Sequence, residues 1–175
     1  MTDVDAVMAR VLSDLDADRT DRVAVNRTDV EVEGLSLGVV VATRGRMLLR
    51  LTDTTFVVPG PPWDPADLVI EVGHAGAVRR SGVRVRAVAG GDRAAELADH
   101  LSSDPTLAAA VLPLDSTSLR ISVVAGHLQA AITLMGASMT RMRIPPTANY
   151  VRLHDDQRTA LLATARALQA CWATV

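Results

Sequence analysis

The spacing of apolar residues changes twice along this chain, and this change constrains the fold more than any other feature of the sequence. Residues 4–15 carry apolar side chains at helical spacing, and Thr2 with Asp5 forms a capping box before them. Across residues 22–88 the apolar residues alternate with polar ones, as in strands that bury one face. Helical spacing returns after residue 91. This order of elements predicts an α+β fold.

The first predicted helix ends near Asp18, in a run of acidic residues. Asp14, Asp16 and Asp18 lie around its last turn, where carboxylates oppose the negative end of the helix dipole. A nearby cation, such as Arg19 or Arg22, is expected to compensate these charges.

The alternating stretch predicts a series of short strands. The parity of the apolar residues changes between 23–25 and 30–32, which predicts a turn or bulge at 26–29. A hairpin turn is expected at 44–45, between two alternating runs. The later strands of this stretch are expected at 35–41, 47–51, 56–58, 68–72 and 83–88.

A proline-rich segment, residues 59–65, interrupts these strands and is expected to form an exposed loop. Trp63 lies within it and has two interpretations: an anchor for a binding partner, or a side chain that folds back onto the sheet. Arg44 and Arg46 flank the tip of the preceding hairpin. We therefore predict that Trp63, Arg44 and Arg46 contact a partner.

The second half of the chain predicts two helices, a hairpin, a weaker strand and a last helix. Asp104 and Pro105 are expected to begin the second helix as its N-cap and first residue. The last helix is expected to be capped by Asp155. In chain order, these elements are expected around residues 94–101, after 105, at 119–123 with 128–134, at 139–144, and from 155 to 172.

Together these elements predict an antiparallel sheet, built from a meander and hairpins and covered by N-terminal, central and C-terminal helices. The length fits a single domain over residues 1–175. An alternative is two intertwined halves: 1–88, a helix plus strands, and 89–175, a helix–hairpin–helix unit.

Several kinds of chemistry are excluded, because the residues that they require are missing from the sequence. All eighteen cationic side chains are arginines, so there is no lysine to form a Schiff base or to reach a phosphate in a P-loop. Cys171 is the only cysteine, which excludes an internal disulfide and an all-cysteine metal site. The glycines and histidines match none of the common nucleotide-binding, hydrolase or zinc motifs. No catalytic residues, no metal and no cofactor are expected.

The chain start has no basic segment followed by an apolar run, and no window reaches the length of a membrane span. A cytoplasmic location without membrane contact is expected. A composition rich in Ala, Val, Arg and Asp, with no lysine, is typical of a bacterial protein from a GC-rich genome. The net charge of −2 and the scarcity of aromatic residues argue against binding to nucleic acid.

The densest positive cluster comprises Arg79, Arg80, Arg84 and Arg86. On a strand, Arg84 and Arg86 point to the same face. Two guanidinium groups side by side can bind a carboxylate or a phosphate, so we predict an anion-binding site at these four arginines. The alternative is a solvated strand face whose charges protect a sheet edge from aggregation.

Three functional hypotheses follow. The first is a non-catalytic cytoplasmic protein-interaction module, of the adaptor, chaperone or inhibitor type, which binds another protein or a second copy of itself. Residues 1–33 hold nine acids against four arginines, a charge asymmetry that suits such contacts. The second hypothesis is a sensor of small anionic ligands that uses the arginine pair on one strand face. The third is a hydrolase-like enzyme that uses His127 or His154.

Overall fold

The computed structural model describes residues 3–46, 48–64, 67–75 and 82–174. The described helices are α1 (Asp3–Leu15), α2 (Gly91–Ser103), α3 (Pro105–Val111) and α4 (Asp155–Trp172). The described strands are β1 (Arg19–Ala24), β2 (Arg27–Val32), β3 (Leu35–Arg46), β4 (Leu49–Pro62), β5 (Val69–Ala75), β6 (Gly82–Ala89), β7 (Ser116–Val124), β8 (His127–Leu134), β9 (Ser138–Met142) and β10 (Thr147–Val151).

These strands form one antiparallel sheet in the order β1-β2-β3-β4-β8-β7-β5-β6. The long central strand β4 has two partners on the same side: residues 55–62 pair with β8, and residues 49–52 pair with β9. Strand β10 then pairs with β9. The predicted α+β fold, an antiparallel sheet with N-terminal, central and C-terminal helices, is confirmed.

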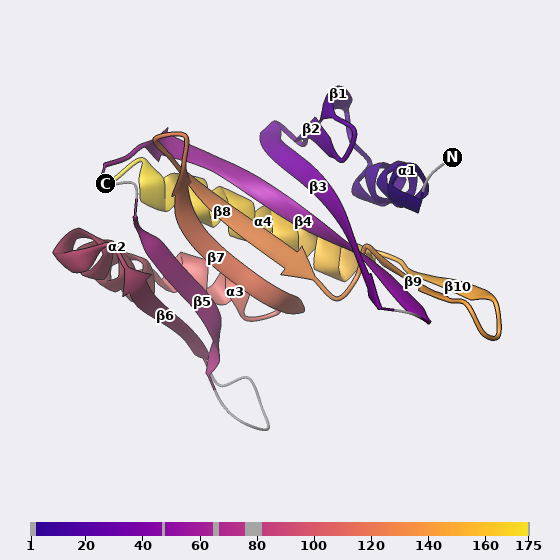
Figure 1. Ribbon diagram of the computed structural model, residues 1–175. Coiled ribbons are helices and arrows are strands. Elements are labelled where there is room, and N and C mark those ends of the chain that lie inside the picture. Colours follow the sequence, from indigo (N-terminus) through magenta and orange to yellow (C-terminus); the bar gives the residue numbers. More distant parts are fainter. Residues whose placement is uncertain (1–2, 47, 65–66, 76–81, 175) are drawn as a thin grey trace.

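The helices pack on one face of this sheet. Helix α1 contacts β3, α4 contacts β4 and β3, α2 contacts β5 and β6, and α3 packs mainly against α4. Figure 1 shows α3 and α4 behind the strands. Every second strand residue points into this layer, and Phe56 lies fully buried at its centre. One hydrophobic cluster joins residues from both halves of the chain.

The open face of the sheet carries small and charged side chains. One row, followed from strand to strand by the pairing register, runs across the whole sheet at this face. In the order of the strands it contains Asp21, Asp29, Gly38, Val57, Ala131, Arg120, Glu71 and Arg86. This row therefore has charged side chains at both ends and small side chains in the middle.

Several strand boundaries differ from the sequence-based expectation. Strand β3 continues to Arg46 and Gly45 pairs with Arg50, so residues 44–45 do not form the turn. The turn between β1 and β2 falls at residues 25–26 rather than 26–29, because Arg27 already pairs with Ala24. In the β3–β4 hairpin the register continues past Gly45, because β4 supplies the pairing there.

The prediction of an exposed loop at 59–65 was wrong for its first four residues. Residues 59–62 belong to β4, where Pro59 pairs with Gln129 and Pro62 pairs with His127. The register shifts between these pairs, and such an irregularity tolerates prolines that cannot donate a ladder hydrogen bond. Pro65 lies outside the described residues.

The helix caps agree with expectation in one place and differ in another. The Asp104 carboxylate accepts hydrogen bonds from the backbone N–H groups of Thr106 and Leu107 at 2.7 and 3.0 Å, as predicted for an N-cap. In α4 the N-cap is His154, and Asp155 is the first helical residue. Asp155 still places a carboxylate in the first turn, where the helix dipole favours it.

Among the described residues, no helix has both the length and the apolar character needed to cross a membrane.

Candidate functional site

Trp63 lies against the body of the protein. Its side chain is partly buried and packs on the hydrophobic core, and its backbone N–H donates to the carbonyl of Gly126 at 2.8 Å. The guanidinium of Arg93 lies 4.7 Å from the centroid of the indole ring. This is the second of the two interpretations of Trp63, in which the side chain folds back onto the sheet. Its contact with a partner stays a prediction.

A cluster of exposed apolar side chains lies where the β3–β4 and β9–β10 hairpins meet. Leu48, Leu49, Met142 and Ile144 are 56, 49, 42 and 72% exposed. Leu49 pairs with Met142 across β4 and β9, and the backbone N–H of Arg143 donates to the carbonyl of Leu48 at 2.9 Å. In Figure 1 the β9–β10 hairpin extends away from the helices. We call these four residues, with Arg50, Arg141 and Arg143, the hairpin-tip surface.

The arginines of this surface are partly tied to the first helix. Arg50 and Arg141 are neighbours across β4 and β9, and their guanidinium groups lie 3.4 and 2.9 Å from the carboxylate of Asp3. Two cations therefore share one anion. Nearby, Arg44 forms an ion pair with Asp53. The members of this surface other than Ile144 line a groove of about 740 Å³, together with Thr43, Gly45 and Pro146.

The predicted partner contacts Arg44 and Arg46 both belong to β3. Arg44 is on the strand next to the hairpin-tip surface, with its charge paired to Asp53. The side chain of Arg46 is not among those that the structure describes.

The structure describes only two of the four arginines of the predicted anion site. Arg79 and Arg80 lie outside the described residues. Arg84 and Arg86 are exposed on β6, whereas Val83 and Val85 between them are partly buried. Both arginines line a hollow of about 480 Å³ on the open face of β5, β6 and β7, which Arg120 also lines.

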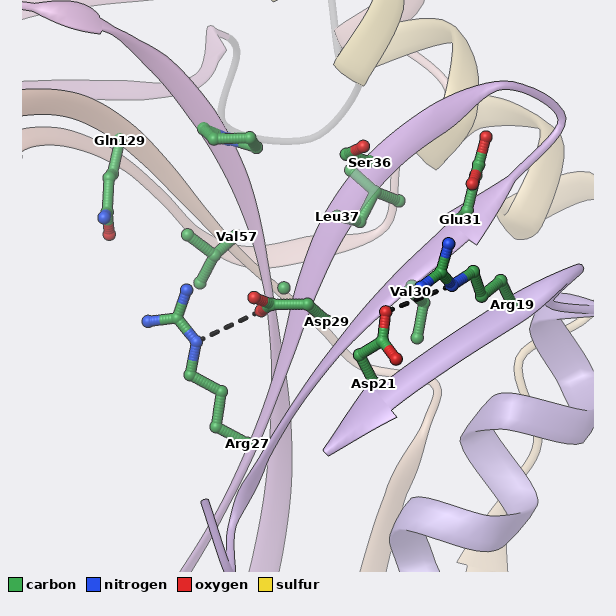
Figure 2. A pocket seen from close by; sticks show the side chains of 12 residues that line it. Arg19, Asp21, Arg27, Asp29, Val30, Glu31, Ser36, Leu37, Val57 and Gln129 are labelled. Atoms are coloured by element: carbon green, nitrogen blue, oxygen red, sulfur yellow. Dashed lines mark hydrogen bonds and ion pairs between the residues drawn. The ribbon is translucent and has the colours of Figure 1, made fainter. Parts of the chain in front are cut away.

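A third pocket, which is polar and has a volume of about 320 Å³, lies at the other end of the same face, over β1, β2 and β3 (Figure 2). Arg19 points to Asp21 at 3.2 Å, and Arg27 points to Asp29 at 3.3 Å. Each cation of this pocket therefore has its own carboxylate, and Glu31 adds a further negative charge. The pocket is polar but offers an incoming anion no uncompensated cation.

The histidines are dispersed. In the described part of the chain, the ring nitrogens of His74 and His127 lie 3.1 Å from the backbone carbonyls of Val111 and Ala125. The His100 ring lies 3.1 Å from the Thr174 hydroxyl, and His154 holds the N-cap position of α4 without a capping hydrogen bond from its side chain. No group of His, Cys, Asp and Glu among the described residues could hold a metal ion. The hypothesis of an enzyme that uses His127 or His154 stays a prediction.

Cys171 is a buried thiol that joins two helices. Its Sγ donates to the Asp104 carboxylate at 3.0 Å, so the residue that caps α3 also binds the end of α4. Burial, reinforced by this carboxylate, raises the pKa of the Cys171 thiol from 9.0 to about 12. The hydrogen bond from the thiol likewise lowers the pKa of Asp104.

We expect the Cys171 thiol to resist modification in the folded protein. At pH 8 its thiolate fraction is lower than that of an unfolded cysteine by a factor of roughly 10³, so reaction with Ellman's reagent should be more than about a hundredfold slower than in urea. The unfolded chain loses this proton above pH 9 and the folded chain only near pH 12. The free energy of unfolding should therefore fall as the pH rises through this window. Equal reaction rates in buffer and urea would contradict the assignment.

Of the residues that line these surfaces, the sequence predicts only Arg84 and Arg86 as binding residues. The members of the hairpin-tip surface are not among the predicted site residues. The alternating pattern predicts only that the apolar members of this surface belong to strands: Leu48 and Leu49 to the strand at 47–51, and Met142 and Ile144 to the strand at 139–144. The two consecutive leucines at a hairpin tip were a usable signal, because a strand that buries one face alternates. The contact with β9 had no signal in the sequence, since it joins segments about ninety residues apart.

A family model described as a protein of unknown function (DUF3156) matches residues 10–172. No curated protein and no solved structure gives a match. The matched range runs from the middle of α1 to the last residue of α4, and so includes all ten described strands. The chain belongs to the DUF3156 family of proteins of unknown function.

Proposed function

We propose that the protein is a non-catalytic interaction module, of the adaptor, chaperone or inhibitor type, that binds another protein through the hairpin-tip surface. The observation that carries this proposal is the exposure of Leu48, Leu49, Met142 and Ile144 beside three arginines. Contiguous exposed apolar side chains commonly mark interaction sites. Methionine and arginine are also enriched in protein interfaces.

The charges indicate the kind of partner. Arg50 and Arg141 share the single carboxylate of Asp3, and among the described residues Arg143 has no carboxylate partner. Leu49 and Met142 lie on one face of β4 and β9, and the neighbouring pair Arg50 and Arg141 lies on the other, because side chains alternate along each strand. The hairpin tip therefore carries positive charge next to its apolar side chains. A protein that presents acidic side chains around an apolar segment would complement it.

The energetics require both parts of the surface. Completing the burial of four half-exposed side chains contributes roughly 1 kcal/mol each, or about 4 kcal/mol in total. Association costs about 4–15 kcal/mol before any contact is counted. The apolar residues alone would leave binding weak. Ion pairs with the arginines add about 0.2–1 kcal/mol each, so a stable complex also has to bury surface beyond these seven residues. A cytoplasmic location is part of this proposal, since Cys171 is free and buried.

A pull-down with matched variants tests the proposal. The double substitution Leu48→Ser with Ile144→Ser removes two of the exposed apolar side chains. Val23→Ser with Val25→Ser is the control, because these valines are 58 and 72% exposed near β1, outside the hairpin-tip surface. We expect the wild type and the control to recover the same stoichiometric partner from a native lysate of the source organism, and the Leu48/Ile144 variant to lose it.

Light scattering on the purified protein then separates the two kinds of partner. A monomer is expected, because the proposed partner is another protein. A dimer that dissociates in the Leu48/Ile144 variant would identify a second copy as the partner. Recovery of the same proteins by both double variants would show that the hairpin-tip surface is not the binding site.

A further inference from the structure

The pairing register places three arginines and one glutamate around a single glycine on the open face of the sheet. Strand β5 lies between β6 and β7. Glu71 of β5 pairs with Arg86 on one side and with Arg120 on the other. Two residues further along β5, Gly73 pairs with Arg84. All these positions point to the same face, because side chains alternate along each strand.

Gly73 forms the floor of a hollow at this place. No heavy atom lies within 4 Å of the position that a Cβ would occupy there. The space above it is about 480 Å³, and Ser118 of β7 also lines it. A glycine flanked by long side chains on both neighbouring strands leaves room for a group that those side chains can reach.

The charges of the hollow do not cancel. The carboxylate of Glu71 lies 3.2 Å from the guanidinium of Arg86, so these two groups neutralise each other. Among the described residues, Arg84 and Arg120 have no carboxylate within ion-pair distance. Two guanidinium groups thus remain uncompensated on either side of Gly73. The polar pocket of Figure 2 differs in this respect, because Arg19 and Arg27 are each paired with an aspartate there.

We infer that this hollow, which we call the Gly73 hollow, binds the phosphate group of a small phosphorylated molecule. Arg84 and Arg120 each present a planar fork of N–H donors that matches two oxygens of an oxyanion. A carboxylate has only two oxygens and would satisfy one fork. A phosphate monoester has three terminal oxygens, and each can accept more than one hydrogen bond, so together they can accept from both forks and from the Ser118 hydroxyl. The remainder of the ligand would project into solvent, since the hollow is open on the outer side of the sheet.

Calorimetric titration with pyrophosphate, at constant ionic strength set by chloride, tests this inference. We expect saturable binding at one site per chain. Arg84→Gln with Arg120→Gln should weaken binding at least tenfold. Arg19→Gln with Arg27→Gln is the matched control, because it removes the same charge from the pocket of Figure 2, and binding should stay within twofold of the wild type.

A third variant separates the shape of the hollow from its charge. Gly73→Val fills the floor without altering any charge, and valine is well suited to a strand position with open space above it. It should abolish binding while the melting temperature of the unliganded protein stays close to that of the wild type.

Three outcomes would overturn the inference. They are the absence of saturable binding by the wild type, equal weakening in the two arginine variants, and unchanged binding in Gly73→Val. Acetate titrated in place of pyrophosphate should bind at least tenfold more weakly, and equal affinities would overturn the assignment to phosphate. None of these substitutions touches the hairpin-tip surface, so the result is independent of the proposed protein interaction.

Discussion

Replacing Gly90 with alanine is expected to lower the free energy of unfolding by about 4 kcal/mol. Gly90 precedes α2 with φ +106°, a conformation outside the left-handed region that other residues can adopt. A Cβ there would lie 2.8 Å from the Cα of Leu68 and 2.9 Å from the Cβ of Ala94. The first neighbour is backbone and the second lies on the helix itself, so neither can move aside cheaply. The free-energy cost of the backbone strain and that of the overpacking therefore add.

Gly91 provides the matched control. It also has a positive φ, of +61°, but no heavy atom lies within 4 Å of its Cβ position. Gly91→Ala should cost only about 1 kcal/mol, from backbone strain alone. In thermal unfolding, the Gly90 variant should melt about 10 °C below the wild type and the Gly91 variant about 3 °C below it. Equal shifts would show that the contact with Leu68 does not decide the stability.

Features of the fold that depend on local sequence could be predicted. Gly90 and Gly91 mark the transition from strand to helix, Asp104 caps α3, and strands β7 and β8 contain the alternating runs expected at 119–123 and 128–134. In each case the signal lies within a few residues: a glycine with positive φ, a side chain that accepts from its own helix, or an alternating run on either side of a turn. Such signals do not depend on the rest of the chain.

Features that depend on a distant partner could not be predicted. Residues 59–62 contain three prolines, yet they continue β4 because β8 lies beside them. Strand β10 has little apolar alternation, and it forms because β9 supplies its ladder. A nearby cation, such as Arg19 or Arg22, was expected to compensate the acids at the end of α1. Arg152 pairs with Asp14 instead, whereas Arg19 pairs with Asp21 and Arg22 with Asp5.

The candidate sites show the same division. The parity of one strand predicted that Arg84 and Arg86 share a face. The addition of Arg120 and Gly73 needed the register of β5 with both of its neighbours, and β7 lies about fifty residues further along the chain. A hollow made by a missing side chain can be recognised only once the flanking strands are in place. The Gly73 hollow thus combines two locally predictable arginines with neighbours that only the tertiary structure supplies.

Asp14 is the acidic residue at the end of α1 on which distant contacts converge. Its carboxylate accepts hydrogen bonds from the Tyr150 hydroxyl at 2.9 Å, from Arg152 Nε at 3.0 Å and from the Leu153 backbone N–H at 3.0 Å. The side chain is only 10% exposed. Burial and the adjacent Asp14 carboxylate raise the pKa of Tyr150, so its hydroxyl stays a donor across the working pH range. This contact joins the first helix to the segment that enters α4.

Replacing Asp14 with alanine should therefore lower the free energy of unfolding by about 3 kcal/mol, because it leaves the Tyr150 hydroxyl and the Leu153 N–H without an acceptor. Asparagine keeps one acceptor oxygen and loses the charge, so Asp14→Asn should cost about half as much. Asp21→Asn is the control: among the described residues the Asp21 carboxylate, 66% exposed, forms an ion pair only with Arg19, and its removal should cost less than about 0.5 kcal/mol. Urea unfolding followed by circular dichroism measures all three. If Asp14→Ala and Asp21→Asn were equally stable, the contacts of Asp14 would contribute no more than a surface ion pair, and the attachment of α1 would rest on its apolar face alone.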